Sequence, residues 1–335
     1  MRILLPARNI ATATVGAAHR LQARRTLRPV VQRWGGDFRV VASLGGNGGS
    51  TWLAERGTEG FVLRQTGGLY EVLILQHLAS IGFPYRTPRL MPTCSGEVMV
   101  PAAPGQQWVL YPVIEGATLR PVKSVDMSRQ IGCLAGAFSA AVVDFELPAS
   151  DGDFGLNLFA SREEPAGDWA QRLRHENSRS ILDRAFALCS DRQDLMKAAV
   201  LERQRQVVYY DFHDRNMLEQ DGKLVGLIDF DSLAMAPRLV DFQNALTYLL
   251  AEPSHRTVAH VTAFSDGFRS AAPLLPKDHL LIAAVMVDRL LWMIGRIMAE
   301  QPLRRHRREL AVRFLDLVDW IVTDEQWLAD TLASA

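Results

Sequence analysis

Short apolar runs separated by glycine-containing turn signals dominate the chain between Asp37 and Gly116. Runs of apolar, β-branched and aromatic residues bounded by such turns are typical of strands. They predict strands at 38–44, 52–56, 61–66, 89–93, 97–100 and 108–116. After the third of these runs, LYEVLILQHLASIG (69–82) has the length and apolar spacing of a helix. This part of the chain therefore predicts a mostly antiparallel sheet with one helix.

Longer segments with helical periodicity follow Gly116. Helices are predicted at 127–145, around 168–190 and 192–206, and at 239–252, 278–300 and 307–322. The change of pattern predicts an α+β protein with an N-lobe over 37–116 and a mainly helical C-lobe over 117–335. Residues 1–36 contain seven arginines and no acidic residue, and we expect them to form a basic arm and a helix of the mature fold.

Composition and charge exclude several classes of protein. Lysine plus arginine equals aspartate plus glutamate at 37 each in 335 residues, so no overall field favours nucleic acid or an acidic membrane surface. The three cysteines are widely spaced, which argues against a disulfide framework or a zinc site and favours a reducing cytoplasm. The longest apolar run, 280–298, is broken by three charged residues and predicts a buried helix, not a membrane span.

An apolar stretch at 207–232, VVYYDFHDRNMLEQDGKLVGLIDFDS, carries an unusual number of side-chain oxygens. Asp221-Gly222 is a strong signal for a two-residue hairpin turn, because both central residues need positive φ. The expected register pairs Gln220 with Lys223, Leu218 with Val225, Asn216 with Leu227 and Asp214 with Asp229. With that register, Asn216 and Asp229 are diagonal neighbours on one face, roughly 7 Å apart or less at Cβ.

An amide oxygen and a carboxylate that leave room for water and phosphate are ligands suited to Mg²⁺. Asn216 and Asp229 are therefore the candidate metal ligands. Asp211 follows the predicted strand VVYY at the start of a loop, where it can face a hydroxyl group near the metal without binding the metal. Asp211 is the candidate catalytic base.

The spacing D-x-x-x-x-N (211–216) followed by I-D-F (228–230) resembles the catalytic loop and the metal-binding aspartate of kinase-fold phosphotransferases. The loop YYDFHDRN is most similar to the aminoglycoside phosphotransferase superfamily, which includes homoserine, choline and methylthioribose kinases. The resemblance implies a bilobal protein-kinase-like fold, with Asp211 as catalytic aspartate, Asn216 and Asp229 as magnesium ligands and Asp241 as a structural acid. His213 matches the family's second histidine and would orient the loop, which begins Tyr209-Tyr210 where the family usually has His-Gly.

The resemblance also assigns roles in the N-lobe. The glycine-rich turn LGGNGGST (44–51) would approach phosphates through its backbone, with Ser50 and Thr51 as hydroxyl donors. Arg64 occupies the place of the usual phosphate-binding lysine, and Glu71 matches the glutamate of the following helix. An arginine there can still pair with a carboxylate and bind phosphate, although its planar fork does not imitate a lysine point charge.

The expected function is phosphoryl transfer from ATP (or GTP), with Mg²⁺, to a hydroxyl of a small molecule such as an amino acid, amino alcohol, nucleoside or aminoglycoside. Candidate acceptor-binding residues in the helical lobe are Asp231, Asp288, Arg289, Trp292 and Arg296. Two alternatives remain open: a non-catalytic nucleotide-binding module, and a phosphohydrolase with a metal cluster at Asp211, His213 and Asp214. The sequence carries no signal for an oligomeric state.

Overall fold

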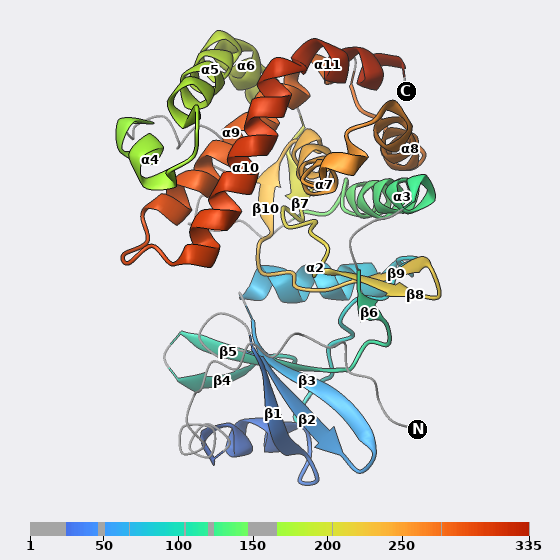
Figure 1. Cartoon of the computed structure of the whole chain (residues 1–335). Coiled ribbons are helices and arrows are strands. Elements are labelled where there is room, and N and C mark those ends of the chain that lie inside the picture. Colours follow the sequence, from blue (N-terminus) through green and yellow to red (C-terminus); the bar gives the residue numbers. More distant parts are fainter. Residues whose placement is uncertain are drawn as a thin grey trace. The chain divides into compact units, whose positions relative to one another are not determined.

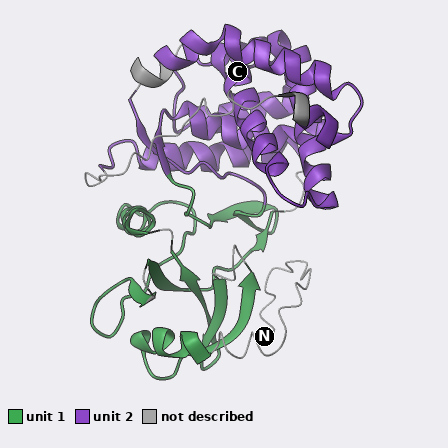
Figure 2. Cartoon of the chain, turned by 90° about the vertical axis from the view of Figure 1, so that its left-hand side faces the viewer, with its two compact units in different colours: residues 1–119, 215–233 green, residues 120–214, 234–335 purple. Residues whose placement is uncertain are grey.

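The computed structural model describes residues 25–45, 51–66, 68–103, 105–119, 124–146, 166–202, 204–275 and 277–334 (Figure 1). They fall into two compact units, which Figure 2 colours separately. Unit 1 comprises Met1–Leu119 and Arg215–Leu233, and unit 2 comprises Arg120–Asp214 and Ala234–Ala335. The hairpin at 215–233 therefore groups with the strand-rich unit, whereas the sequence analysis assigns it to the helical lobe. Most of the expected basic arm, residues 1–24, lies outside the described residues.

Unit 1 contains a five-stranded antiparallel sheet in the order β1-β2-β3-β5-β4. The strands are β1 (Arg39–Gly45), β2 (Thr51–Arg56), β3 (Glu59–Gln65), β4 (Val100–Ala103) and β5 (Gln106–Pro112). Residues 25–31 form a helix that continues into the 3₁₀ turn η1 (Gln32–Trp34), and α2 spans Leu69–Ser80. The predicted first three strands and the helix after them are confirmed.

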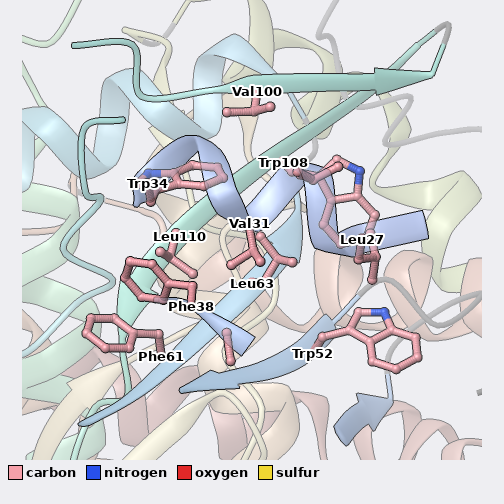
Figure 3. Packing of buried hydrophobic residues seen from close by; sticks show 12 residues of the cluster. Leu27, Val31, Trp34, Phe38, Trp52, Phe61, Leu63, Val100, Trp108 and Leu110 are labelled. Carbon is pink, nitrogen blue, oxygen red and sulfur yellow. The ribbon is translucent and has the colours of Figure 1, made fainter. Parts of the chain in front are cut away.

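The side chains of β3 alternate between the two faces of this sheet, and each face contacts a different helical segment. Phe61 and Leu63 point into a core cluster with Leu27, Val31 and Trp34 of the N-terminal helical segment (Figure 3). Strand residues alternate between the two faces, so Val62 and Arg64 point the other way. Val62 packs there with Val72 of α2. The same alternation therefore directs Arg64 toward the helix that carries Glu71.

The strand predicted at 89–93 is absent. Pro88 precedes this segment and Pro92 lies within it, and proline cannot donate to a strand ladder. The Met91 N–H donates to the Leu110 carbonyl at 2.8 Å, so the segment touches the sheet without forming a regular strand. The strand predicted at 97–100 begins only at Val100.

The predicted hairpin is present, but its register differs from the expected one. Strand β8 (Met217–Gln220) pairs with β9 (Lys223–Leu227), and β6 (Ala117–Thr118) completes a three-stranded sheet. Gln220 faces Lys223 as predicted, but Leu218 faces Gly226 and Met217 faces Leu227. A bulge at Val225 causes this shift of one residue. The Val225 carbonyl accepts a hydrogen bond from the Arg86 N–H at 2.8 Å, so the extra residue contacts a neighbouring segment.

Unit 2 consists of helices around a two-stranded antiparallel sheet, β7 (Gln206–Val208) with β10 (Ala234–Ala236). The helices are α3 (Val125–Ala141), α4 (Ala166–Leu173), α5 (Ser178–Asp191), α6 (Gln193–Glu202), α7 (Leu239–Leu250), the 3₁₀ turn η4 (Pro253–His255), α8 (Val258–Arg269), α9 (His279–Met298), α10 (Arg305–Thr323) and α11 (Glu325–Ser334). The predicted helix at 192–206 ends at Glu202, and the sequence analysis did not predict α8 or α11.

Helix α9 lies within the core of unit 2, as expected for the apolar run at 280–298. Leu290, Leu291 and Ile294 are fully buried. Among the residues that the structure describes, no helix is long and apolar enough to span a bilayer. Helices α3 and α8 cross so closely that a Cβ at Gly132 would overlap the Phe264 carbonyl and a Cβ at Gly267 would overlap the Arg129 carbonyl. Glycine at these two positions permits the close approach.

Candidate active site

Arg64 forms the predicted ion pair with Glu71 inside unit 1. The Arg64 Nη1 lies 2.5 Å from the Glu71 Oε1, and the two side chains are only 7% and 3% exposed. The Thr66 hydroxyl donates to the other carboxylate oxygen, Oε2, at 2.7 Å. Glu71 is thus held by two partners from the end of β3, which leaves Arg64 in one defined position.

Two carboxylates from the segment after β9 also contact the Arg64 guanidinium. Its Nη2 lies 2.5 Å from Asp229 Oδ1 and 3.2 Å from Asp231 Oδ2. Burial alone would lower the pKa of Arg64, but the negative charges of Glu71 and Asp229 outweigh this effect and raise the pKa above its ordinary value. Asp231, expected only as an acceptor-binding residue, therefore also contacts Arg64.

The altered hairpin register changes the expected relation between Asn216 and Asp229. The Ile228 N–H donates to the Asn216 carbonyl at 2.9 Å, so Asn216 stands opposite Ile228, and the predicted pairs of Asn216 with Leu227 and of Asp214 with Asp229 are wrong. Asp229 has a φ of 73°. Regular strand alternation therefore ends before Asp229, and its side-chain direction does not follow from the ladder. Asn216 is buried and Asp229 is half-buried.

The oxygen donors of this hairpin fit a hard divalent cation. Asn216 offers an amide oxygen, and Asp229 offers a carboxylate whose neighbour in sequence, Phe230, is fully buried. Mg²⁺ typically takes one or two protein oxygens and completes its shell with water and phosphate. In the described part of the chain, no three His, Cys, Asp or Glu side chains lie close enough together to form a metal site from protein ligands alone. Asp211, His213 and Asp214 therefore do not form such a cluster.

The glycine-rich turn can be placed only in part. Residues 46–50, and with them Ser50, lie outside the described residues. Thr51 is the direct cross-strand partner of Arg64 in the β2–β3 ladder. Directly opposite residues share a face of the sheet, so the Thr51 side chain lies on the same face as the Arg64 guanidinium.

In unit 2, helix α7 holds the backbone of the loop that contains Asp211. The two carboxylate oxygens of Asp241 accept hydrogen bonds from the Tyr209 and Tyr210 N–H groups at 3.1 and 3.0 Å. One turn further along α7, the Asn244 Oδ1 accepts from the Phe212 N–H at 2.8 Å. Tyr210 has a φ of 62°, and a left-handed residue of this size persists only where its surroundings hold it. Asp241 is the structural acid that the resemblance implies.

The side chains of this loop divide between the core and a polar group. Tyr209 and Phe212 are fully buried, and each ring packs edge-on against Phe138 of α3. Asp211 and His213 are both 23% exposed, and the His213 Nε2 lies 3.4 Å from the Asp211 Oδ2. The alternation of buried aromatic and polar side chains therefore fixes the loop on one side and leaves Asp211 partly accessible on the other.

Tyr248 lies beside the polar group of the loop. The Tyr248 ring meets the His213 imidazole edge-on at 5.5 Å. Burial raises the pKa of the Tyr248 phenol first, and the negative charge of Asp211 raises it further, whereas Arg289 of α9 lowers it. Tyr248 therefore stays a neutral donor near Asp211. The sequence analysis did not identify Tyr248 or Asn244, although both follow Asp241 at helical spacing, at i+7 and i+3.

The complete burial of Asp241 predicts a pH-dependent contribution to stability. Burial raises the pKa of Asp241 to about 7, although the Tyr210 and Tyr209 N–H groups oppose the shift. Because the folded state holds this proton more tightly than the unfolded chain, the contribution is complete below the unfolded pKa near 4 and is lost as the pH rises through about 7. In Asp241→Asn, we expect the free energy of unfolding to fall less between pH 5 and pH 8 than in the wild type, as measured by urea titration.

Asn244→Ala is the matched control for this prediction. It removes an N–H acceptor from the same loop and should cost about 1–3 kcal/mol at every pH, but it removes no titrating group. The wild-type pH slope should therefore survive in Asn244→Ala. Equal slopes in the wild type and in Asp241→Asn would show that Asp241 does not titrate in this range.

The chain resembles known proteins over most of its length. Residues 34–274 match the model of the phosphotransferase enzyme family. The matched range contains Arg64 and Glu71, the hairpin with Asn216 and Asp229, and the loop with Asp211. A comparison with curated protein sequences finds no match.

Solved structures of small-molecule kinases have a similar fold. A microcompartment-associated aminopropanol kinase superposes with a TM-score of 0.68 at 17% identity, covering 92% of this chain and 98% of the kinase. An aminoglycoside phosphotransferase from Alicyclobacillus acidocaldarius gives 0.65 at 16% identity, covering 91% and 93%. Amicoumacin kinase in complex with AMP-PNP, Ca²⁺ and Ami gives 0.60 at 15% identity, covering 90% and 95%. These likenesses confirm the predicted protein-kinase-like α+β fold.

Proposed function

The chain belongs to the phosphotransferase enzyme family, and on that basis we propose that it transfers the γ-phosphate of ATP to a hydroxyl group of a small molecule. The chain is a small-molecule kinase. ATP as donor is supported by the nucleotide analogue in the amicoumacin kinase complex, and a divalent cation by the Ca²⁺ of the same complex.

The observation that carries this proposal is the buried contact of Arg64 with both Glu71 and Asp229. An arginine that merely lay on the exposed surface of the strand would not be buried and would not contact two carboxylates from distant parts of the sequence. We assign to Arg64 the role of positioning the donor phosphates, together with the backbone of the turn at 44–51 and the hydroxyls of Ser50 and Thr51. Glu71 holds Arg64 in place for that task.

We assign the metal to Asn216 and Asp229, whose oxygens would hold Mg²⁺. When bound, the ion would neutralise charge on the phosphates. Asp229 also forms an ion pair with Arg64, so a bound cation would share this carboxylate with the guanidinium. Asp211 orients the acceptor hydroxyl and accepts its proton, and His213, at 3.4 Å from Asp211, orients that carboxylate.

The test of this proposal is ADP formation with Mg²⁺ over a panel of amino acids, amino alcohols, nucleosides and aminoglycosides, with GTP as a parallel donor. We expect at least one acceptor to raise ADP formation above the background without acceptor. Chelation of the metal by EDTA should abolish that activity, and added Mg²⁺ should restore it, because two protein ligands alone cannot replace the cation on the phosphates.

Two other results would contradict the proposal. Tight ATP binding without transfer to any acceptor would favour a non-catalytic nucleotide-binding module. Phosphate release from simple esters in the absence of nucleotide would favour a phosphohydrolase.

A further inference from the structure

Arg289 of α9 is a buried cation with unsatisfied hydrogen-bonding capacity. The residue is only 8% exposed. Its guanidinium lies 4.0 Å from the ring centroid of Tyr210 and 4.3 Å from that of Trp292. Within the described part of the chain, neither its Nε nor its Nη1 has a hydrogen-bond partner. These two nitrogens carry three of the five N–H groups of an arginine.

The two aromatic rings stabilise the charge of Arg289 but do not satisfy those N–H groups. A ring face attracts a cation through its quadrupole but offers no oxygen acceptor. The N–H groups of Nε and Nη1 still need such acceptors. Buried donors left without acceptors are costly and rare in native proteins. The position of Arg289 therefore indicates an acceptor that the described part of the chain does not supply.

Arg289 lies close to the proposed catalytic loop within unit 2. Tyr210, whose ring contacts the guanidinium, directly precedes Asp211. The Tyr248 phenol lies near both groups, because the charge of Asp211 raises its pKa and the charge of Arg289 lowers it. A molecule bound to Arg289 would therefore have its other atoms near the candidate base.

The charges around Arg289 favour an acceptor that is anionic at one end. Arg296, one turn further along α9, lies over the Trp292 ring at 5.2 Å and adds a second positive charge. Three acids act on the two tyrosines beside Arg289: the buried Asp288 raises the pKa of the Tyr210 phenol, and Asp211 and Asp214 of the loop raise that of the Tyr248 phenol. Two arginines would repel a purely cationic acceptor, whereas the acids could attract an amine at the far end of a zwitterion.

We propose that Arg289 binds the carboxylate of the acceptor, so that the substrate is a small hydroxylated acid, with hydroxy amino acids as the best match. This inference rests on the proposed phosphotransferase function and specifies its substrate class. A carboxylate fits the planar guanidinium through two parallel N–H···O bonds. The Tyr210 and Trp292 rings would hold the guanidinium flat for that contact.

Three pairs of compounds that differ only in the carboxylate test this inference: L-serine and ethanolamine, L-homoserine and 3-amino-1-propanol, and L-threonine and 1-amino-2-propanol. Affinity is measured by calorimetry and turnover by ADP formation. We expect at least one acid to bind the wild type about tenfold or more tightly than its amine, because hydrogen bonds to charged groups discriminate at about that level.

The variants are Arg289→Met, Arg289→Lys and, as the control, Arg305→Met at the start of α10. Arg289→Met should weaken binding of the acid and raise its KM about 10- to 100-fold, with kcat and nucleotide affinity within about threefold. Arg289→Lys should recover part of the loss, and Arg305→Met should change KM little because that side chain is 92% exposed. The melting temperature of Arg289→Met should not fall, since the change removes unsatisfied donors from the interior.

Several outcomes would overturn the inference. The wild type could bind the amines as tightly as the acids, or could bind none of the three acids. Arg289→Met could keep its affinity for the acids, or could lose affinity for the nucleotide and not for the acids. The last result would assign Arg289 to the donor phosphates. Carboxylate-dependent binding without any ADP formation would support the subsite and contradict the phosphotransferase function, so the two failures are distinguishable.

Discussion

Replacing Asp211 with alanine should lower kcat by about 10²- to 10⁴-fold, the range observed when a general base is removed. Asp211 is partly accessible, and its loop is held by the backbone bonds to Asp241 and Asn244, which do not involve the Asp211 side chain. The substitution should therefore leave the loop in place. Nucleotide affinity, measured by titration with AMP-PNP, should change by less than about threefold because the proposed phosphate ligands lie on other segments.

Asp214→Ala is the matched control for Asp211→Ala. Asp214 lies in the same loop, is 55% exposed and approaches His213 no closer than 3.9 Å in its ion pair. Its removal should change kcat less than about threefold. Undiminished turnover in Asp211→Ala would exclude Asp211 as the base, and a parallel loss of AMP-PNP affinity would assign it to nucleotide binding. The isosteric Asp211→Asn separates loss of charge from loss of packing.

Glu71→Ala is the second change with a large expected effect, and it acts on stability as well as on activity. Removing one partner of a buried ion pair typically costs about 3–5 kcal/mol, because the remaining charge is left uncompensated. We expect a cost near the lower end of that range, since Asp229 and Asp231 still contact Arg64. The Thr66 hydroxyl also loses an acceptor at 2.7 Å. Urea unfolding monitored by far-UV circular dichroism measures the effect.

A double variant distinguishes the structural role of this pair from its role in catalysis. Arg64→Met with Glu71→Leu replaces the pair by apolar side chains of similar size, and such replacements are often neutral or stabilising. We expect the double variant to regain most of the stability lost in Glu71→Ala while its KM for nucleotide stays raised. Recovery of both properties would mean that Arg64 does not contribute to phosphate binding. Arg64→Lys tests whether a point charge suffices at this position.

The fold was predictable from the sequence wherever the pattern of apolar residues and the turn residues beside it indicated the same element. The apolar run FVL between turn signals predicts the strand at 61–66, and the helical spacing predicts the helix at 69–82; β3 and α2 lie there. The segment at 89–93 is apolar enough for a strand, but its two neighbouring prolines prevent a ladder. Helices α8 and α11 are not among the predicted helices, because polar residues such as Ser265 and Asp266 in α8 and Asp330 in α11 interrupt their apolar spacing.

The hairpin that carries the candidate metal ligands was predictable from the sequence, but its register was not. Asp221-Gly222 indicated the correct turn, and Gln220 faces Lys223 as expected. The bulge at Val225 depends on Arg86, which is far away in sequence and docks on the strand through its backbone. No local pattern records such a contact. The same limitation applies to the contact of Asp231 with Arg64, which depends on tertiary structure alone.

Unit 1 is built from two stretches of chain separated by residues 120–214. During translation its main sheet can form early, but β6 has no partner until β8 has left the ribosome. Arg64 likewise meets Glu71 long before Asp229 exists, so the guanidinium begins with one carboxylate and acquires the second late. The strand-rich half of this enzyme therefore cannot mature as an autonomous N-terminal domain, and a nascent chain paused before residue 233 would present an incomplete sheet edge to chaperones.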